Sequence, residues 1–134
     1  MNDLMAAIGL VQLKKLDAMN EKRCRAIRRY LDRIGGLRTI KPLFPYTLDG
    51  SSYWIFGVRH ANRDQLILYL KRNGVATSVH YMPLQNHPLF KPYASNTPVI
   101  DDVWSTMITL PLFADISDIE VDYVVETLHM FEER

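Results

Sequence analysis

The chain is 134 residues long, which suits one domain with its own hydrophobic core and excludes a multi-domain assembly. Hydrophobic residues make up 48% and charged residues 23%, ordinary globular values that exclude an intrinsically disordered chain. The 16 Lys and Arg against 15 Asp and Glu leave a net charge of +1. Such a chain has no overall field to hold nucleic acid or an anionic membrane, so neither is expected as a partner.

Cysteine content and the N-terminal pattern indicate the compartment. The single cysteine, Cys24, cannot form an internal disulfide, and no paired Cys or His spacing predicts a zinc site. No segment reaches the roughly 18 apolar residues that cross a bilayer, and the N-terminus lacks the pattern of a signal peptide. We therefore expect a cytoplasmic protein without a membrane partner.

Residues 2–34 contain no proline and are followed by Gly35 and Gly36, a helix-stop signal, so they predict one long helix. In its second half, apolar residues recur at helical spacing while basic residues occupy the other faces, as on a surface helix. The apolar positions are Leu13, Leu16, Cys24, Ile27, Leu31 and Ile34. We expect Cys24 to be an inert packing residue.

The first half of this predicted helix is different. Residues 4–11, LMAAIGLV, are apolar on every face, and such a helix requires neighbours all round. The rest of the chain has its own core to form. We infer that a second domain or another subunit, absent from this chain, covers the first three turns.

Three strands are predicted further along the chain. Residues 52–58 are rich in aromatic and β-branched residues, residues 75–81 follow a helix of residues 62–73, and residues 107–110 are ended by Pro111. Asn62 and Gln65 resemble an N-cap pair for that helix, which closes at Asn73 and Gly74.

Two more helices complete the pattern. Residues 99–105 predict a short helix, in which Asp101 and Asp102 are a solvated, dipole-compatible start. A capping box from Ser117 to Glu120 begins the last helix. Its apolar face consists of Val121, Val124, Val125, Leu128 and Phe131. Three strands with helices on one side predict an α/β fold, a two-layer sandwich.

A polar and aromatic cluster lies at residues 77–88, where the predicted second strand ends and a long proline-rich loop begins. If the strand alternates through its end, Ser78 and His80 face one side and Tyr81 the other. The pattern leaves two interpretations open, a hydrogen-bonded interior His80 with Tyr81 as an aromatic plug, or a ligand site. A metal site at His80 and His87 is disfavoured, because no third ligand is near.

Other polar and aromatic residues favour structural roles. His60 and His129 are expected at the surface. Tyr53, Trp54 and Phe56 resemble a stacking platform for single-stranded nucleic acid, but no basic stripe accompanies them, so core packing is favoured. The chain contains no phosphate-binding loop, nucleophile elbow or H-E-x-x-H helix.

A linked series of motifs runs along the chain: MNDLMAAIGLVQL at residues 1–13, SYW at 52–54, RD at 63–64, GVATSVHYMPL at 74–84 and LPLF at 110–113, followed by Ser117. In order and spacing the series resembles the C-terminal part of the DegT/DnrJ/StrS sugar aminotransferases, which depend on pyridoxal phosphate. The resemblance covers nearly the whole chain. It implies the C-terminal small domain of a fold-type-I aminotransferase, with a small, mainly antiparallel sheet.

The resemblance also implies an activity and a site. Relatives transfer an amino group, usually from glutamate, to a keto group on a nucleotide-linked sugar, with pyridoxal phosphate as the electron sink. His80 and Tyr81 match a His-aromatic pair that lies near the sugar nucleotide at the active-site mouth. Residues 1–34 match a helix between the domains, near the dimer interface, and residues 35–134 match the small domain.

The cofactor-binding part of that family is absent from this chain. In relatives, a lysine of the large N-terminal domain carries the cofactor in a Ser-rich, Gly-flanked context. None of the six lysines here stands in that context; they are Lys14, Lys15, Lys22, Lys41, Lys71 and Lys91. We therefore expect no catalytic, cofactor-binding or metal-binding residue, and no transamination by the chain alone.

Three hypotheses follow. The first is a small domain that contributes a substrate-side wall and dimer surface, with the sugar and amino donor bound through the large domain. The second is a stand-alone module without catalytic function that self-associates through the helix of residues 1–13. The third, a fragment without biological function, predicts poor solubility and easy proteolysis near the N-terminus.

Overall fold

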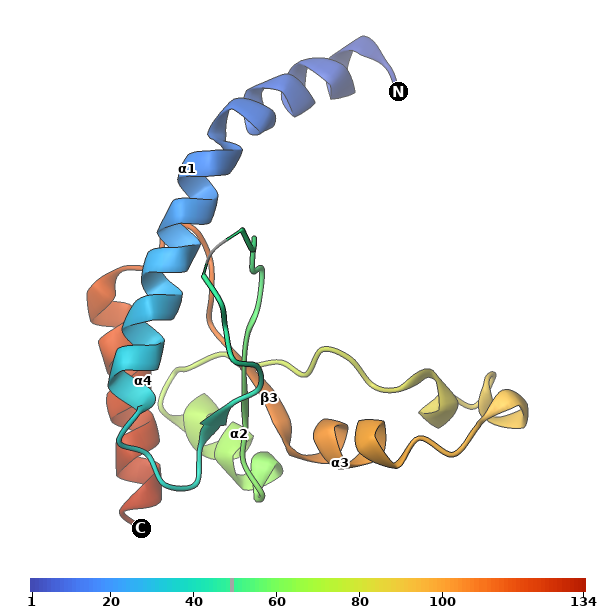
Figure 1. The fold of residues 1–134 in the computed structure, drawn as a ribbon, viewed down its shortest axis with the longest axis vertical. Coiled ribbons are helices and arrows are strands. Elements are labelled where there is room, and N and C mark those ends of the chain that lie inside the picture. The colour runs from blue at the N-terminus through green and yellow to red at the C-terminus, as the bar shows by residue number, and fades with distance from the viewer. Residues whose placement is uncertain (49) are drawn as a thin grey trace.

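The computed structural model describes residues 1–48 and 50–134 as four α-helices, three short strands and two 3₁₀ turns (Figure 1). The helices are α1 (Asp3–Ile34), α2 (Arg63–Arg72), α3 (Pro98–Thr106) and α4 (Asp118–Glu132). The strands are β1 (Lys41–Pro42), β2 (Phe56–Arg59) and β3 (Met107–Leu110), and the turns are η1 (Leu84–Asn86) and η2 (Lys91–Tyr93). The predicted α/β class, with a small antiparallel sheet and a long N-terminal helix, is confirmed.

Helix α1 begins after Asn2, whose side chain accepts a hydrogen bond from the Met5 amide at 3.0 Å, and it ends before Gly35 as predicted. Only its last part is buried, and the apolar stripe therefore packs over a shorter length than its spacing suggests. Leu13 and Leu16 are 65% and 45% exposed, because the first half of α1 projects beyond the domain (Figure 1).

Helices α1 and α4 lie side by side and run in parallel, and a series of ion pairs joins them (Figure 1). Four of these pairs keep a constant separation of 93 positions along the chain: Lys22 with Asp115, Arg25 with Asp118, Arg29 with Asp122, and Arg33 with Glu126. Hydrogen bonds from Arg29 lower the pKa of Asp122. Because most of these groups are solvated, they define the helix register more than they stabilise it.

The core lies between these helices and the sheet. Tyr30 of α1 stacks on Phe56 of β2 with ring centroids 4.6 Å apart, and its hydroxyl donates to the Pro111 carbonyl at 2.9 Å. A Cβ at Gly57 of β2 would lie 2.8 Å from Leu43 Cδ2 and 3.2 Å from Leu43 Cβ, so a side chain there would displace Leu43. The largest fully buried residues are Tyr30, Phe56, Ile27, Leu37, Ile40, Leu66, Leu70, Ile108, Leu110, Ile116, Leu128 and Val58.

Two predicted strands differ in the structure. The strand predicted at residues 52–58 begins only at Phe56, which pairs with Leu110. The next pair would place Ile55 opposite Pro111, which has no amide hydrogen to donate. Residues 75–81 form no strand and make one bridge, from Ser78 to Thr109, before the chain leaves the sheet edge. The third strand is instead β1. No sequence pattern indicates this strand, because it has only two residues and one of them is a proline.

The residues around α2 correct two further expectations. The Asn62 side chain does not cap α2. The backbone amide of Asn62 instead donates to His60 Nδ1 at 3.0 Å. His60, expected at the surface, is only 7% exposed because its ring packs edge-on against Phe131. The C-terminus agrees with the prediction: Gly74 takes a positive φ of 73°, and the Val75 amide donates to the Leu70 carbonyl.

Helices α3 and α4 agree with the sequence patterns. The first turn of α3 contains the exposed Asp101, and Asp102 beside it pairs with Arg59 at 2.7 Å. The capping box is present, since Ser117 Oγ accepts from the Glu120 amide and the Glu120 carboxylate accepts from the Ser117 amide. Local capping therefore determines where α4 begins.

The C-terminal end of α4 holds the connection from α1 to the sheet. Burial alone would raise the pKa of Glu132, but its carboxylate accepts hydrogen bonds from the Thr39 hydroxyl and from the Arg38, Thr39 and Ile40 amides. These bonds lower the pKa of Glu132 from 4.5 to about 2. Ionised Glu132 thus stabilises the fold above about pH 4.5, and this contribution is lost as the pH falls toward about 2.

We expect Glu132→Gln to lower the free energy of unfolding at pH 7 by about 2 kcal/mol, because charged hydrogen bonds are replaced by neutral ones. The variant should also lose much of the pH dependence of stability between about pH 4.5 and 2. Urea unfolding across a pH series measures both effects. Glu126→Gln is the control, since Glu126 makes one exposed ion pair at 3.7 Å. Equal pH dependence in the two variants would contradict the assignment.

Candidate functional site

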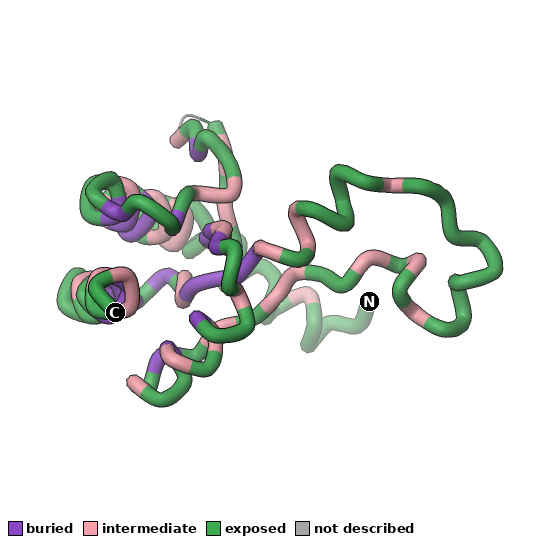
Figure 2. Tube along the Cα trace, turned by 90° about the horizontal axis from the view of Figure 1, so that it is seen from below, coloured by how far each residue is buried: buried purple, intermediate pink, exposed green. Residues whose placement is uncertain are grey.

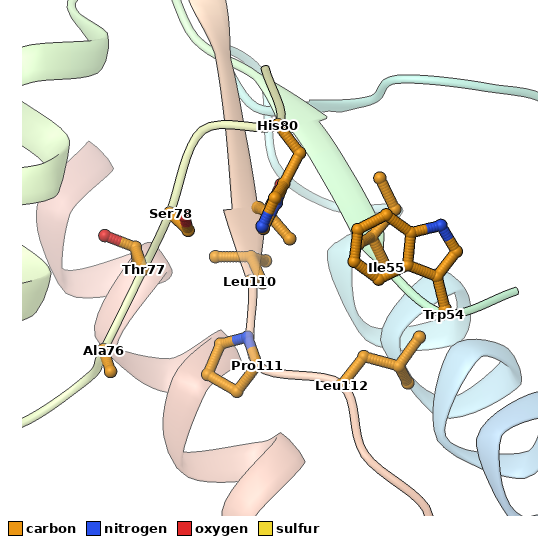
Figure 3. A pocket seen from close by; sticks show the side chains of 10 residues that line it. Trp54, Ile55, Ala76, Thr77, Ser78, His80, Leu110, Pro111 and Leu112 are labelled. Atoms are coloured by element: carbon orange, nitrogen blue, oxygen red, sulfur yellow. The ribbon is translucent and has the colours of Figure 1, made fainter. Parts of the chain in front are cut away.

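An open pocket of about 360 Å³ lies at the end of β3, where three separate segments meet (Figure 3). One segment precedes β2, one is the bridge region before the long loop, and one runs from β3 into the turn after it. The lining residues are Trp54, Ile55, Ala76, Thr77, Ser78, His80, Thr109, Leu110, Pro111 and Leu112. The pocket is therefore a product of the tertiary fold and of no single motif.

Backbone pairing brings the bridge region to β3. The Ser78 amide donates to the Thr109 carbonyl at 3.2 Å, and the Thr109 amide donates to the Ser78 carbonyl at 2.7 Å. Two residues later, His80 Nδ1 lies 3.0 Å from the Thr109 hydroxyl. Ser78 and His80 both line the pocket, so the predicted shared face exists although the segment is not a strand.

Three aromatic rings form the rim. The His80 ring is edge-on to Trp54 at 5.3 Å and to Tyr81 at 4.9 Å, while the Trp54 and Tyr81 rings are nearly parallel and 6.3 Å apart. The His80–Tyr81 peptide bond is cis. Trp54 is 58% and Tyr81 66% exposed, which leaves aromatic surface available to a ligand. Phe56 packs in the core as predicted, but Trp54 does not.

The chemistry of the lining is neutral. Its floor is aliphatic, and its polar groups are the hydroxyls of Thr77, Ser78 and Thr109 and the imidazole of His80. None of the ten residues that line it is a Lys, Arg, Asp or Glu. Such a pocket can bind an uncharged polar group and pack against an apolar face, and it offers an anion no Lys or Arg.

The lysines do not fit a cofactor that requires an imine. All six are exposed, and none lines the pocket. Lys22 pairs with Asp115 at 2.7 Å, and Lys41 donates to the Leu37 carbonyl. An activated amine must be desolvated and aimed at the reacting carbon. The pocket lining therefore has no lysine that could hold pyridoxal phosphate as an imine.

Metal sites and membrane spans were sought over the described part of the chain. Residues 1–48 and 50–134 contain no group of three His, Cys, Asp or Glu side chains placed to hold a metal ion. No helix in the same ranges has both the length and the hydropathy of a membrane span.

His129 is partly buried, with Nε2 3.4 Å from the Arg33 carbonyl, and Cys24 Sγ lies 3.9 Å from the Ser51 carbonyl.

The long loop after the pocket extends away from the core (Figures 1 and 2). No residue from 76 to 106 is buried. Several large apolar side chains of the loop and of α3 are exposed: Met82, Leu84, Leu89, Phe90, Tyr93, Val99 and Ile100. Together with the exposed half of α1, this loop leaves an unusual amount of apolar surface uncovered in a chain of this size.

Sequence reasoning predicted His80 and Tyr81 as site residues; His80 lines the pocket, whereas Tyr81 lies beside it and is not part of the lining. It did not single out Trp54 and Thr109, which also line the pocket. Trp54 lies within an aromatic run, and its position depends on where β2 begins. Thr109 offered a weak signal, because it is the polar residue between Ile108 and Leu110 in a strand that is otherwise apolar and buried.

Comparison with known proteins identifies the family. A family model for the DegT/DnrJ/EryC1/StrS aminotransferase family matches residues 1–129. This chain belongs to that family. The chain superimposes on Spr1654 of Streptococcus pneumoniae, assigned as a sugar aminotransferase and solved in a PMP form, with a TM-score of 0.88 and 32% identity. The match covers 99% of this chain and 35% of Spr1654.

Two further solved aminotransferases show the same fold. PseC of Helicobacter pylori, involved in the biosynthesis of pseudoaminic acid, has a TM-score of 0.90 at 23% identity, with 99% of this chain and 38% of PseC covered. The sugar aminotransferase CalS13 of Micromonospora echinospora has a TM-score of 0.89 at 21% identity, covering 97% of this chain and 35% of CalS13. This aminotransferase-family chain therefore spans little more than a third of the length of these relatives.

Proposed function

We propose that the chain is the C-terminal part of a pyridoxal-phosphate-dependent aminotransferase that acts on nucleotide-linked keto sugars. Residues 1–34 serve as the helix between domains, and residues 35–134 serve as the small domain. The observation that carries the proposal is the neutral pocket with His80 and Tyr81 at its mouth, in a chain whose family match extends over residues 1–129.

The pocket suits a sugar ring. Hexose rings present hydroxyl groups at their edges and apolar C–H faces, which match hydroxyl and imidazole partners beside an aromatic surface. In the pocket, His80 and Ser78 supply polar groups and Trp54 supplies an exposed ring, while the exposed ring of Tyr81 lies beside His80 and Trp54. Because no charged residue lines the pocket, the diphosphate of the substrate lies outside it.

The chemical step belongs to another part of the enzyme in this proposal. Pyridoxal phosphate supplies the electron sink when it is bound by the large domain, which also receives the amino donor. His80 and Tyr81 orient the sugar from the small-domain side. Alone, this chain binds no cofactor and does not transaminate, because its lysines are solvated and none of them lines the pocket.

The exposed half of α1 supports a second part of the proposal, homo-oligomer formation through residues 1–13 of a cytoplasmic enzyme. Leu4, Met5, Ile8, Leu10 and Val11 are each at least half exposed, and among the described residues none packs over them. An apolar face of this size is unfavourable in water. The same observation favours the alternative function, a self-association module without catalytic activity.

The first test is cofactor binding. We expect no internal aldimine absorbance when pyridoxal phosphate is added to the chain, and no stoichiometric lysine adduct after borohydride reduction and mass spectrometry. Spr1654, which has been solved in a PLP form, is the positive control. A stoichiometric adduct on one lysine of this chain would contradict the division between domains.

The second test locates the sugar. We expect a UDP-linked keto hexose to shift the amide resonances of Ser78, Thr109 and Leu110, and UDP alone to shift them much less. His80→Ala should weaken binding about tenfold, since a buried polar contact is worth about 1.4 kcal/mol. His129→Ala is the control, because His129 lies on α4 and does not line the pocket.

Resonance shifts confined to other surfaces, or caused equally by UDP, would contradict substrate binding at this pocket. The same titration separates the two functions, because a module that only self-associates leaves the pocket resonances unchanged.

The third test is the oligomeric state. Sedimentation velocity at micromolar concentration should show a dimer or larger species for the chain, and the double substitution Ile8→Glu, Val11→Glu should yield a monomer. Charges on the apolar face oppose its burial, whereas Lys14→Glu, on an exposed residue outside residues 1–13, should leave association unchanged. A monomeric wild-type chain would contradict association through this helix.

A further inference from the structure

Thr109 occupies an unusual position in β3. Its side chain is 6% exposed, its backbone is in register with Gly57 of β2 on one side, and it bridges to Ser78 on the other. The hydroxyl lies 3.0 Å from His80 Nδ1. A buried hydroxyl in the centre of a small sheet therefore contacts the one ionisable group that lines the pocket.

Two proton arrangements are compatible with this distance. Either the Thr109 hydroxyl donates to an unprotonated Nδ1, or a protonated Nδ1 donates to the hydroxyl oxygen. In the second arrangement the hydroxyl proton needs an acceptor of its own. Within residues 1–48 and 50–134, no other side-chain or backbone acceptor makes a hydrogen bond with Thr109 Oγ1.

The cost of the two arrangements differs. A buried hydroxyl that lacks an acceptor for its proton is strongly disfavoured, whereas an unused lone pair on a hydroxyl oxygen costs little. The backbone carbonyl of Ser78 accepts from the Thr109 amide, and no hydrogen bond joins it to the Thr109 hydroxyl. The first arrangement is therefore the stable one.

We propose that Thr109 is a positioning residue that donates to His80 Nδ1 and holds the neutral imidazole in the tautomer protonated at Nε2. Nε2–H then acts as a hydrogen-bond donor, and the ring in Figure 3 lies over the pocket between Ser78 and Trp54. The ligand group that it meets must be an oxygen acceptor. If the proposed function holds, this is a hydroxyl or carbonyl oxygen of the sugar ring.

His80 and Thr109 have two different roles, which a substitution at His80 alone would not distinguish. His80 contacts the ligand, and Thr109 acts through His80 by selecting which nitrogen carries the proton. Selecting a tautomer pre-organises the donor before the ligand arrives, so the ligand does not have to displace a competing proton arrangement.

Nitrogen NMR of the histidine-labelled chain tests the tautomer directly. At about pH 8.5, where an imidazole of ordinary pKa near 6.5 is neutral, His80 should show one protonated and one unprotonated ring nitrogen. The His80→Gln variant identifies its signals among those of the four histidines. We expect Thr109→Val to move the two nitrogen shifts of His80 toward each other, as the tautomers begin to exchange.

Two further variants separate positioning from general destabilisation. Thr109→Ser keeps the hydroxyl and should retain the wild-type nitrogen shifts. Thr127→Val removes a fully buried hydroxyl that donates to the Tyr123 carbonyl at 2.8 Å within α4, and it should leave the His80 signals unchanged.

A wild-type His80 that is protonated at Nδ1, or that already shows averaged nitrogens, would overturn the proposal. These results would do so even if Thr109→Val failed to fold, because they come from the unmodified chain. Failure of the sugar titration with an Nε2–H tautomer in place would instead contradict the proposed function alone.

Discussion

Backbone pairing along both edges of β3 is the constraint on which the rest of the structure depends. On one edge β3 pairs with β2, which brings Phe56 under Tyr30 and closes the core. On the other edge it pairs with Ser78, and this bridge positions His80, two residues later, at the pocket. Because Pro111 ends the strand, pairing stops there and the pocket opens at this point.

Helix α1 is connected to the same strand end. The Tyr30 hydroxyl binds the carbonyl of Pro111, which lines the pocket, and the ion pairs between α1 and α4 define how the helix lies on the domain. The anchored half of α1 therefore sets the direction in which its apolar half projects. Helix α1 in this way connects a surface proposed for assembly with a pocket proposed for the substrate.

The pocket combines features that favour recognition over covalent chemistry. It is neutral, open and rimmed by aromatic rings, and its imidazole is held by a buried hydroxyl instead of a carboxylate. Imine formation with pyridoxal phosphate requires an activated amine, and the solvated lysines of this chain do not provide one. In the proposed function, the small domain therefore orients the sugar and the large domain supplies the cofactor chemistry.

Local patterns in the sequence were sufficient for the helices, because capping by Ser117 and Glu120, the Gly74 turn and apolar periodicity act within a few residues. The linked motifs were also sufficient to predict the family, and they singled out His80, which lines the pocket. Only the tertiary structure decided where β2 begins, that residues 75–81 make a single bridge, that His60 is buried, and that Trp54 and Thr109 belong to the pocket. Strand limits and burial depend on partners distant in sequence, and no local pattern contains that information.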